Sequence, residues 1–274
     1  MRVKRFLSLP VLAVFSLMAF VYYITIFVFI ADWVGLHTSP GTLNAFVFTL
    51  LASLCLFSFV VSVLTDPGNV PYSYFPDVEG RGTAVNGKDS VEQKRCDKCS
   101  TYKPPRTHHC RVCRRCVLKM DHHCMWINNC VGYWNYKAFF VLAFYATIAS
   151  IHSTVIFINF VLRKDWESFK GSSLKIYYVA CALMLISLTT TLLTLSGWHV
   201  YLILHNMTTI EYYEVQRAKW LARKSGQSYR HPFNMGAYKN ITLVLGSNML
   251  KWLWPTAVNH LKDGVSFPTL RDNP

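Results

Sequence analysis

Charged side chains are scarce in this chain of 274 residues, and acidic ones are the scarcest. Only 15% of the residues are charged, whereas 52% are apolar and 15% are aromatic. A soluble domain rarely has so little charge, so the composition argues against one. No internal repeat is visible, which gives no sign of a solenoid or another repeat architecture.

Charge is absent from four stretches that are long enough to cross a bilayer, which takes about 20 residues. We therefore predict transmembrane helices at residues 6–31, 42–64, 138–162 and 176–204. The first stretch follows a short basic tail at 1–5, as a signal peptide would. Its apolar core is longer than the roughly 7–15 residues of a signal peptide, which favours an uncleaved anchor.

Lys and Arg are also missing from the loop between the first two spans. Twelve basic residues lie in 66–137, nine follow His205, three lie in the amino-terminal tail, and four lie in the loop between the third and fourth spans. The positive-inside rule therefore places tail 1–5, segment 65–137 and tail 205–274 in the cytosol. The net charge of +14 then favours contact with anionic lipid head groups over nucleic acid.

Cysteine is concentrated in segment 96–130, which holds seven cysteines and four histidines in 35 residues. A cytosolic face is reducing, which favours metal ligands or catalytic thiols over disulfides. Zinc usually takes four Cys or His ligands, so two Cys3His sites would use six cysteines and two histidines. One cysteine and two histidines are then spare. The other two cysteines, Cys55 and Cys181, lie in predicted spans, where we expect buried structural thiols.

The spacing of these residues is C-x2-C-x9-HC-x2-C-x2-C-x4-DHHC-x5-C-x4-N-x3-F, and it closes with Asn135 and Phe139. It resembles the cysteine-rich domain of the Asp-His-His-Cys family of protein S-acyltransferases. Three further motifs agree with that family: Asp66-Pro67-Gly68, Thr208-Thr209-Ile210-Glu211, and His231-Pro232-Phe233-Asn234 with Gly236 and Asn240. Met125 departs from the proline that many members carry there, so the loop after Cys124 should be slightly less rigid.

The resemblance implies an α-helical polytopic membrane protein with four transmembrane helices. A cytosolic cysteine-rich domain with two structural zinc ions, at 96–139, lies between the second and third helices. It also implies which ligands share a metal, in two sets that interleave along the chain. One set is Cys96, Cys99, His109 and Cys116, and the other is Cys110, Cys113, His123 and Cys130.

Cys124 and His122 remain for chemistry. A thiolate is the nucleophilic form of cysteine, and a nearby histidine can accept the thiol proton. In an extended segment His122 and Cys124 share a face and His123 points the opposite way. We predict Cys124 as nucleophile, His122 as general base and Asp121 as the carboxylate that orients His122. The last role needs a backbone bend, which the resemblance implies and the sequence does not show.

The implied reaction has two steps. Cys124 takes a long-chain acyl group, such as palmitoyl, from acyl-CoA, and a cysteine thiol of a protein substrate then takes it from Cys124. The expected partners are acyl-CoA, the bilayer and membrane-associated proteins with cytosolic juxtamembrane cysteines. Arg106, with its basic neighbours Lys103 and Arg111, is a candidate ligand of the CoA phosphates, although a solvated basic face is an equal alternative.

For the supporting residues the sequence leaves alternative roles open. Thr208, Thr209 and Glu211 either cap a helix or, by the resemblance, steady Asp121. Asn240 either holds the tail through its amide or lies in a solvated loop. The small residues Thr147, Ala149 and Ser150 favour helix packing over lining of an acyl cavity. His152 and His199 are expected to form hydrogen bonds between helices.

Two other classes of protein remain as alternatives. A catalytically silent, zinc-stabilised membrane scaffold would keep the metal ligands but gives Cys124 and His122 no role. A transporter would need paired charges inside the spans, which are absent. No organelle signal is visible, so we expect the Golgi, the endoplasmic reticulum or the plasma membrane, with the first two favoured.

Overall fold

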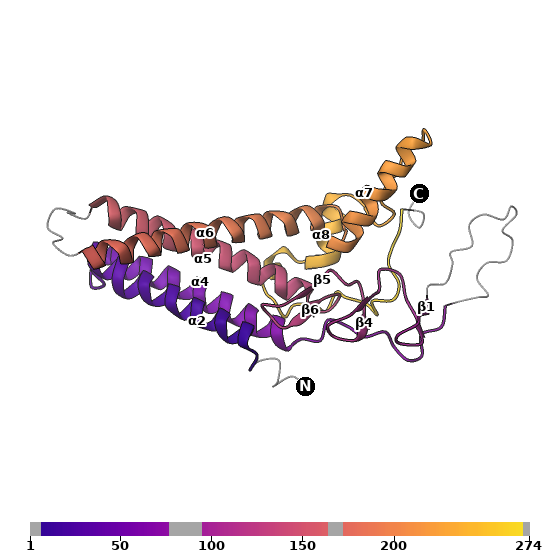
Figure 1. The fold of residues 1–274 in the computed structure, drawn as a ribbon, viewed down its shortest axis with the longest axis horizontal. Coiled ribbons are helices and arrows are strands. Elements are labelled where there is room, and N and C mark those ends of the chain that lie inside the picture. Colours follow the sequence, from indigo (N-terminus) through magenta and orange to yellow (C-terminus); the bar gives the residue numbers. More distant parts are fainter. Residues whose placement is uncertain (1–6, 77–94, 164–171, 271–274) are drawn as a thin grey trace, which may run out of the picture.

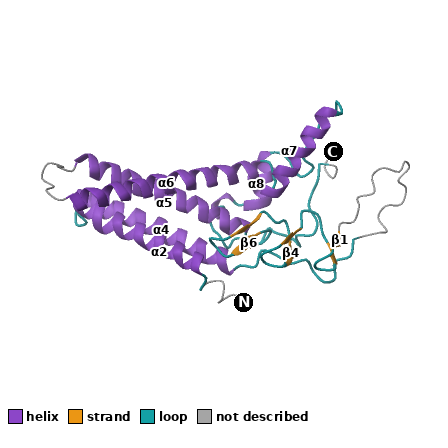
Figure 2. Ribbon diagram, viewed as in Figure 1, coloured by secondary structure: helices purple, strands orange, loops and turns teal. Residues whose placement is uncertain are grey.

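The computed structural model describes residues 7–76, 95–163 and 172–270. Four long helices form an elongated bundle, and the cysteine-rich segment and the carboxy-terminal tail gather at one end of it (Figures 1 and 2). The predicted tail 1–5 lies outside the described residues, as do 77–94 of the cytosolic segment and the last four residues. The prediction of four transmembrane helices around a cysteine-rich insert is confirmed.

The first span is built from three consecutive pieces: α2 (Leu9–Tyr23), the π-helix η1 (Ile24–Ile30) and α3 (Ala31–Trp33). A π-helix is wider than an α-helix and is uncommon. Here it turns five of its seven residues into the bundle, among them Thr25. The Thr25 hydroxyl donates to the Val21 carbonyl at 2.7 Å and lies 2.6 Å from the Ser153 hydroxyl. The irregular turn therefore ties the first span to the third.

The other spans are α4 (Ser39–Leu64), α5 (Tyr136–Arg163) and α6 (Ser172–Leu204). Each begins a few residues before the predicted apolar stretch. Polar or capping residues extend a helix past its apolar run, and hydropathy does not register them. At α4 the Thr38 side chain accepts a hydrogen bond from the Gly41 amide at 3.1 Å, which fixes the helix start.

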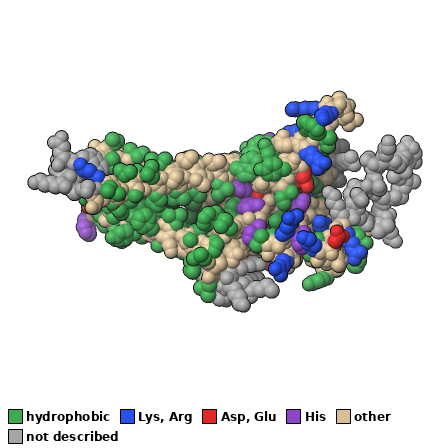
Figure 3. Space-filling model, in the orientation of Figure 1, with side chains coloured by type: hydrophobic (Ala, Val, Ile, Leu, Met, Phe, Trp, Pro, Cys, Tyr) green, Lys and Arg blue, Asp and Glu red, His purple; other side chains and the backbone are tan. Residues whose placement is uncertain are grey.

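Small polar residues join the helices inside the bundle. The Thr147 hydroxyl on α5 lies 2.7 Å from that of Ser196 on α6, and Thr154 lies 2.9 Å from Thr189. This confirms the packing role expected for Thr147. The outside of the bundle is covered by exposed apolar side chains, which continue along most of its length (Figure 3).

The cysteine-rich segment consists of three short antiparallel hairpins. They are β1 (Arg95–Cys96) with β2 (Thr101–Tyr102), β3 (His108–Cys110) with β4 (Arg115–Val117), and β5 (His122–Cys124) with β6 (Asn129–Val131). Two- and three-residue strands are too short to be stable alone. Their own apolar cluster is small, so metal ligands must supply much of the stabilisation.

The tail folds back onto the bundle through α7 (Thr209–Lys224), α8 (Ala237–Leu245) and the 3-10 turn η2 (Met249–Lys251). The buried ammonium of Lys137, in the first turn of α5, donates to three tail carbonyls at 2.8–2.9 Å, those of Leu245, Lys251 and Ala257. The tail is thereby held beside the hairpins.

Candidate active site

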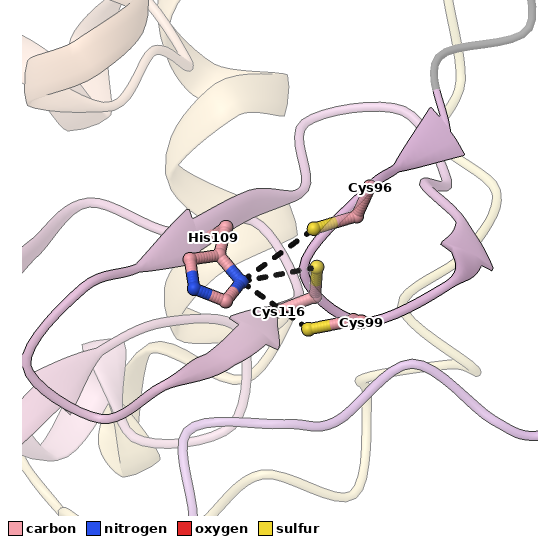
Figure 4. A group of neighbouring side chains, drawn as sticks. All are labelled: Cys96, Cys99, His109 and Cys116. Atoms are coloured by element: carbon pink, nitrogen blue, oxygen red, sulfur yellow. Dashed lines mark hydrogen bonds between the residues drawn. The ribbon is translucent and has the colours of Figure 1, made fainter.

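Cys96, Cys99, His109 and Cys116 converge on one point, as Figure 4 shows. The three sulfurs lie 3.5, 3.2 and 4.0 Å from Nδ1 of His109. Ligands on one tetrahedral zinc, with Zn–S near 2.3 Å and Zn–N near 2.05 Å, would be about 3.6 Å apart. The donor set and its spacing therefore fit a structural zinc ion, which would take the place of a hydrophobic core.

The second set has the same arrangement. Its three sulfurs lie 3.4–3.7 Å from Nδ1 of the histidine, in the set Cys110, Cys113, His123 and Cys130. In each site the histidine and the last cysteine face each other across a hairpin, as His109 pairs with Cys116 and His123 with Cys130. Both sets thus fit zinc.

The expectation that the chain has no internal repeat is wrong. Each ligand of the first site recurs 14 residues later in the second site, in the order Cys, Cys, His, Cys. The shift also carries His108-His109-Cys110 onto His122-His123-Cys124. Cys124 is therefore the first cysteine of a third repeat in which Ile127 replaces the next ligand.

Strand β5 separates the two histidines of the motif. His123 faces the second metal site, whereas His122 and Cys124 share the other face of the strand. Asp121 precedes the strand, so the alternation of a strand does not apply to it. The imidazole of His122 donates from Nδ1 to Oδ2 of Asp121 at 2.7 Å. The bend that the sequence could not show is present.

Asp121 is completely buried, and α7 supplies its other partners. The Thr209 amide donates to Oδ1 and the Thr209 hydroxyl to Oδ2, both at 2.9 Å. Burial alone would raise the pKa of Asp121, but the hydrogen bond from His122 and the neighbouring histidines hold that pKa below its usual value. The first turn of α7 therefore keeps a carboxylate against His122.

His122 is charged more readily than a free histidine. Burial alone would lower the pKa of its imidazole, but hydrogen bonds with Asp121 and Cys124 raise that pKa to about 9. The charged imidazole of His122 is therefore the favoured form beside Cys124.

Thr208 and Glu211 cap a helix, one of the two roles that the sequence left open, while Thr209 takes the other by holding Asp121. Thr208 accepts from the Glu211 amide and Glu211 accepts from the Thr208 amide, a capping box that starts α7. The Glu211 carboxylate also accepts two hydrogen bonds from Arg106, at 2.6 and 2.7 Å. Burial alone would raise the pKa of Glu211, but the Arg106 guanidinium lowers it to about 2. The start of α7 is thus fixed against the hairpins.

The role predicted for Arg106 needs correction. Its side chain is 1% exposed, its other donors contact Asn206, and Phe233 stacks on the guanidinium at 4.5 Å. A guanidinium with these partners is not free for a CoA phosphate. Lys103 lies beside Arg106 in the lining of a cavity of about 550 Å³ between the hairpins, α7 and the tail.

Asn240 holds the tail, and the solvated alternative is excluded because the residue is completely buried. Its amide donates to the Leu204 carbonyl at 2.7 Å and to the Asn234 side chain at 2.7 Å. Its oxygen accepts from the Met235 amide at 2.9 Å. Asn240 therefore joins the end of α6 to α8.

A larger cavity of about 730 Å³ runs from Cys124 into the helix bundle. All four spans line it, and its walls are almost entirely apolar. At the Cys124 end lie Met125 and Trp126, and at the other end lie Tyr22 and Ser150. Ala149 and Ser150, which we expected to serve helix packing, line this cavity instead.

Sequence reasoning missed Tyr136 and gave His199 only a packing role. The expected hydrogen bond between helices exists, because His199 Nδ1 lies 3.0 Å from the Tyr136 hydroxyl. His199 also lies beside His122, with 6.1 Å between ring centroids. A histidine within a span was the available signal. For His152 the expectation is wrong, because its Nδ1 has no hydrogen-bond partner among the described residues and its ring stacks on Phe48.

The fold and the site define a multi-pass membrane protein in which two metal-type Cys/His sets support an Asp–His–Cys group at the mouth of an apolar cavity. A profile of the DHHC palmitoyltransferase family matches residues 89–216. "Probable protein S-acyltransferase 15" of Arabidopsis thaliana is 62% identical over 257 residues, which are 93% of this chain and 100% of that protein.

Other relatives agree with this. "Probable protein S-acyltransferase 16" of Arabidopsis thaliana is 50% identical over 97% of this chain and 94% of its own length. "Palmitoyltransferase ZDHHC15" of Rattus norvegicus is 38% identical over 63% of this chain and 49% of its own length. The chain therefore belongs to the DHHC palmitoyltransferase family of enzymes.

Proposed function

We propose that this protein transfers a long-chain acyl group, such as palmitoyl, from acyl-CoA to cysteine thiols of other proteins, through a thioester on Cys124. The observation that carries the proposal is the position of Cys124, between the His122–Asp121 pair and the mouth of the 730 Å³ apolar cavity. Each buried CH2 of an acyl chain contributes about 0.8 kcal/mol, so such a cavity favours a long chain.

In the first step the Cys124 thiolate attacks the thioester carbonyl of acyl-CoA. The bond from that carbonyl to the CoA sulfur breaks, and the imidazolium of His122 gives its proton to the departing CoA thiolate. In the second step neutral His122 accepts the proton of the substrate thiol, whose sulfur attacks the Cys124 thioester. Cys124 leaves as a thiolate beside imidazolium, which restores the starting state. Asp121 keeps the Nδ1 proton of His122 in place, so that Nε2 faces the sulfur.

The two Cys/His sets have a structural role in this proposal. Zinc bound there supplies no chemistry to the substrate, and stabilises the hairpins. His123 and Cys130 pair across the hairpin that carries Cys124, so the second set fixes the nucleophile directly. Asn129, opposite Cys124, donates to the Thr65 carbonyl at 2.8 Å and so ties this hairpin to the end of α4.

The cavity of about 550 Å³ is our candidate for the water-soluble part of acyl-CoA. Its lining combines the ammonium of Lys103 with the aromatic rings of Tyr102 and Tyr229. An ammonium suits phosphate and an aromatic ring suits the face of a base. Lys103 thus takes the role that we had predicted for Arg106.

The basic residues favour a cytosolic active site. Lys and Arg side chains gather at the end of the bundle that carries the hairpins (Figure 3). By the positive-inside rule that end faces the cytosol. The substrates would then be membrane-associated proteins with cytosolic cysteines near the bilayer, on Golgi, endoplasmic reticulum or plasma membranes.

The test is acyl labelling of the detergent-solubilised full chain with palmitoyl-CoA, read by intact mass and by hydroxylamine sensitivity. Wild type should gain one hydroxylamine-labile palmitoyl group, and Cys124→Ser should gain none. The control is Cys181→Ser, which removes a buried thiol of α6 away from the cavity and should leave labelling unchanged. An unlabelled wild type with metal in both sites would refute the proposal and favour the zinc-stabilised scaffold.

A further inference from the structure

His199 is a buried histidine of α6 that the proposed mechanism leaves unused. His199 is 1% exposed, and it lies five residues before the end of α6. An ionisable side chain is costly inside a transmembrane helix and is usually retained for a function. Its surroundings therefore deserve a physical explanation.

His199 and three other rings form a cluster. Phe139 meets His122 edge-on with 5.2 Å between centroids, and meets His199 edge-on with 5.1 Å. Tyr136 lies 5.6 Å from His199 by centroids. Three of these rings come from α5 and α6, and only His122 comes from the hairpins. The cluster thus connects the proposed base to the membrane helices.

The hydrogen bond between Tyr136 and His199 bears on which nitrogen of His199 carries a proton. If the Tyr136 hydroxyl donates to Nδ1 of His199, the neutral imidazole carries its proton on Nε2. One nitrogen of His199 lies within 4.8 Å of both an Asp121 oxygen and a nitrogen of His122. That distance places the His199 ring directly beside the Asp121–His122 pair.

These three residues do not have the spacing of a metal site. Oδ2 of Asp121 and Nδ1 of His122 are 2.7 Å apart. Two such ligands on one tetrahedral zinc would be about 3.3 Å apart, given Zn–N and Zn–O lengths near 2.0 Å. Asp121 and His122 therefore form a hydrogen-bonded pair, and His199 lies next to it.

We propose that His199, fixed by Tyr136, is a positioning residue that holds the His122 imidazole against Cys124 from the membrane side. This inference rests on the proposed function of Cys124 and His122. Asp121 restrains one nitrogen of His122 from the hairpin side, while His199 and Phe139 stop the ring from tilting away from the sulfur. Phe139 also lines the acyl cavity, so a bound acyl chain would press on the same support.

The experiment measures the reactivity of Cys124 without any acyl donor. Iodoacetamide alkylation of Cys124 is followed by peptide mass mapping in the full chain, with metal content and thermal unfolding recorded for every variant. The variants are His199→Ala, His199→Gln and Tyr136→Phe. Gln can still accept from Tyr136 and donate on its other side, so it preserves the pattern of hydrogen bonds. The control is His152→Ala, which removes a span histidine that contacts Phe48 and not Asp121 or His122.

We expect His199→Ala to slow alkylation of Cys124 by about tenfold, the order expected when a reacting group is slightly misplaced. His199→Gln should recover most of the rate, Tyr136→Phe should slow it by a smaller factor, and His152→Ala should leave it unchanged. In acyl labelling, His199→Ala should lower the maximal rate and leave the KM for palmitoyl-CoA unchanged.

A wild-type alkylation rate in His199→Ala and Tyr136→Phe would overturn the inference. So would equal losses in His199→Ala and His199→Gln when both retain metal and unfold like wild type. If His199→Ala does not fold, the other two variants still test the inference. A positioning role requires Cys124 to be alkylated more slowly in Tyr136→Phe than in His199→Gln. Absence of acyl labelling in wild type would refute the proposed function, and the alkylation rates would still report on positioning.

Discussion

At the scale of single residues, the proposed chemistry depends on one carboxylate that accepts three hydrogen bonds. Asp121 accepts from His122 and twice from Thr209, once through the amide and once through the hydroxyl. The amide is present whatever the side chain at 209, whereas the hydroxyl is not. The contribution of the Thr209 hydroxyl can therefore be measured separately from that of the amide.

We predict that Thr209→Val lowers the maximal rate of Cys124 acylation by about tenfold, since a buried hydrogen bond to a charged group contributes about 1.5–3 kcal/mol. Thr209→Ser keeps the hydroxyl and should retain most of the rate. Single-turnover labelling with palmitoyl-CoA gives the rate constants, and thermal unfolding shows whether α7 is intact. Equal rates for the Val and Ser variants would contradict a role for the hydroxyl.

The residues also show where sequence reasoning succeeds. Counting ligands showed that two four-ligand sites leave one cysteine over, and the resemblance identified it as Cys124. Sequence reasoning could not place His199 or Tyr136 beside His122, because they are 77 and 14 residues away along the chain and their contact depends on how α5 and α6 pack. It also failed for Arg106, because a basic residue looks the same in sequence whether it is solvated or paired with a carboxylate 105 residues away.

At the scale of elements, the helix bundle is more than an anchor. Each span contributes residues to the cavity, and α5 contributes along the half nearest the hairpins, from Phe139 to Ser150. At 1.5 Å per residue this stretch of helix is about 17 Å long. The depth of the cavity should therefore limit the acyl chain that Cys124 accepts.

We predict that Ala149→Phe shifts the preference from palmitoyl-CoA to shorter acyl-CoA donors, because the larger ring fills the deep end of the cavity. The control is Ile148→Phe, the adjacent residue of α5, which is 38% exposed on the outside of the bundle and should leave the preference unchanged. Competition between myristoyl-CoA and stearoyl-CoA for acylation of Cys124 measures the ratio. An unchanged ratio in Ala149→Phe would show that the acyl chain lies elsewhere.

The start of α4 differs from the hydropathy prediction because a capping residue sets it. Apolar runs mark where a helix is suitable for lipid, and caps such as Thr38 mark where it begins. The π-helix of the first span has no hydropathy signature at all, because Ile24–Ile30 is apolar in either geometry. Its position follows from packing, including the contact of Thr25 with Ser153.

At the scale of the whole molecule, the tail is a structural part of the active site. It is joined to the bundle by Asn240 at the end of α6 and by Lys137 at the start of α5. Lys137 is 2% exposed and its three acceptors are spread over 13 residues of tail. Lys137 therefore holds the stretch from the end of α8 to Ala257 through three hydrogen bonds.

We predict that Lys137→Met releases this segment, since Met keeps the apolar stem and removes the ammonium that satisfies the three carbonyls. Limited proteolysis of the full chain should cut near 246–258 faster than in wild type, and thermal unfolding should shift downward. The control is Lys251→Met, which removes an exposed ammonium in the same segment and should leave cleavage unchanged. Wild-type resistance in Lys137→Met would show that other contacts hold the tail.

The sequence by itself determined the spans and the ligand count that leaves one cysteine over, and its resemblance to a known family supplied the two ligand sets and Cys124 as the spare thiol. Hydrophobic length and metal-ligand spacing are local properties that survive in any arrangement of the chain. Only the tertiary structure decided which groups surround Cys124: Asp121 held by α7, His122 against Phe139 and His199, and a cavity shared by all four spans. These contacts join segments far apart in the chain, and their geometry follows from how helices and hairpins pack, which no spacing encodes.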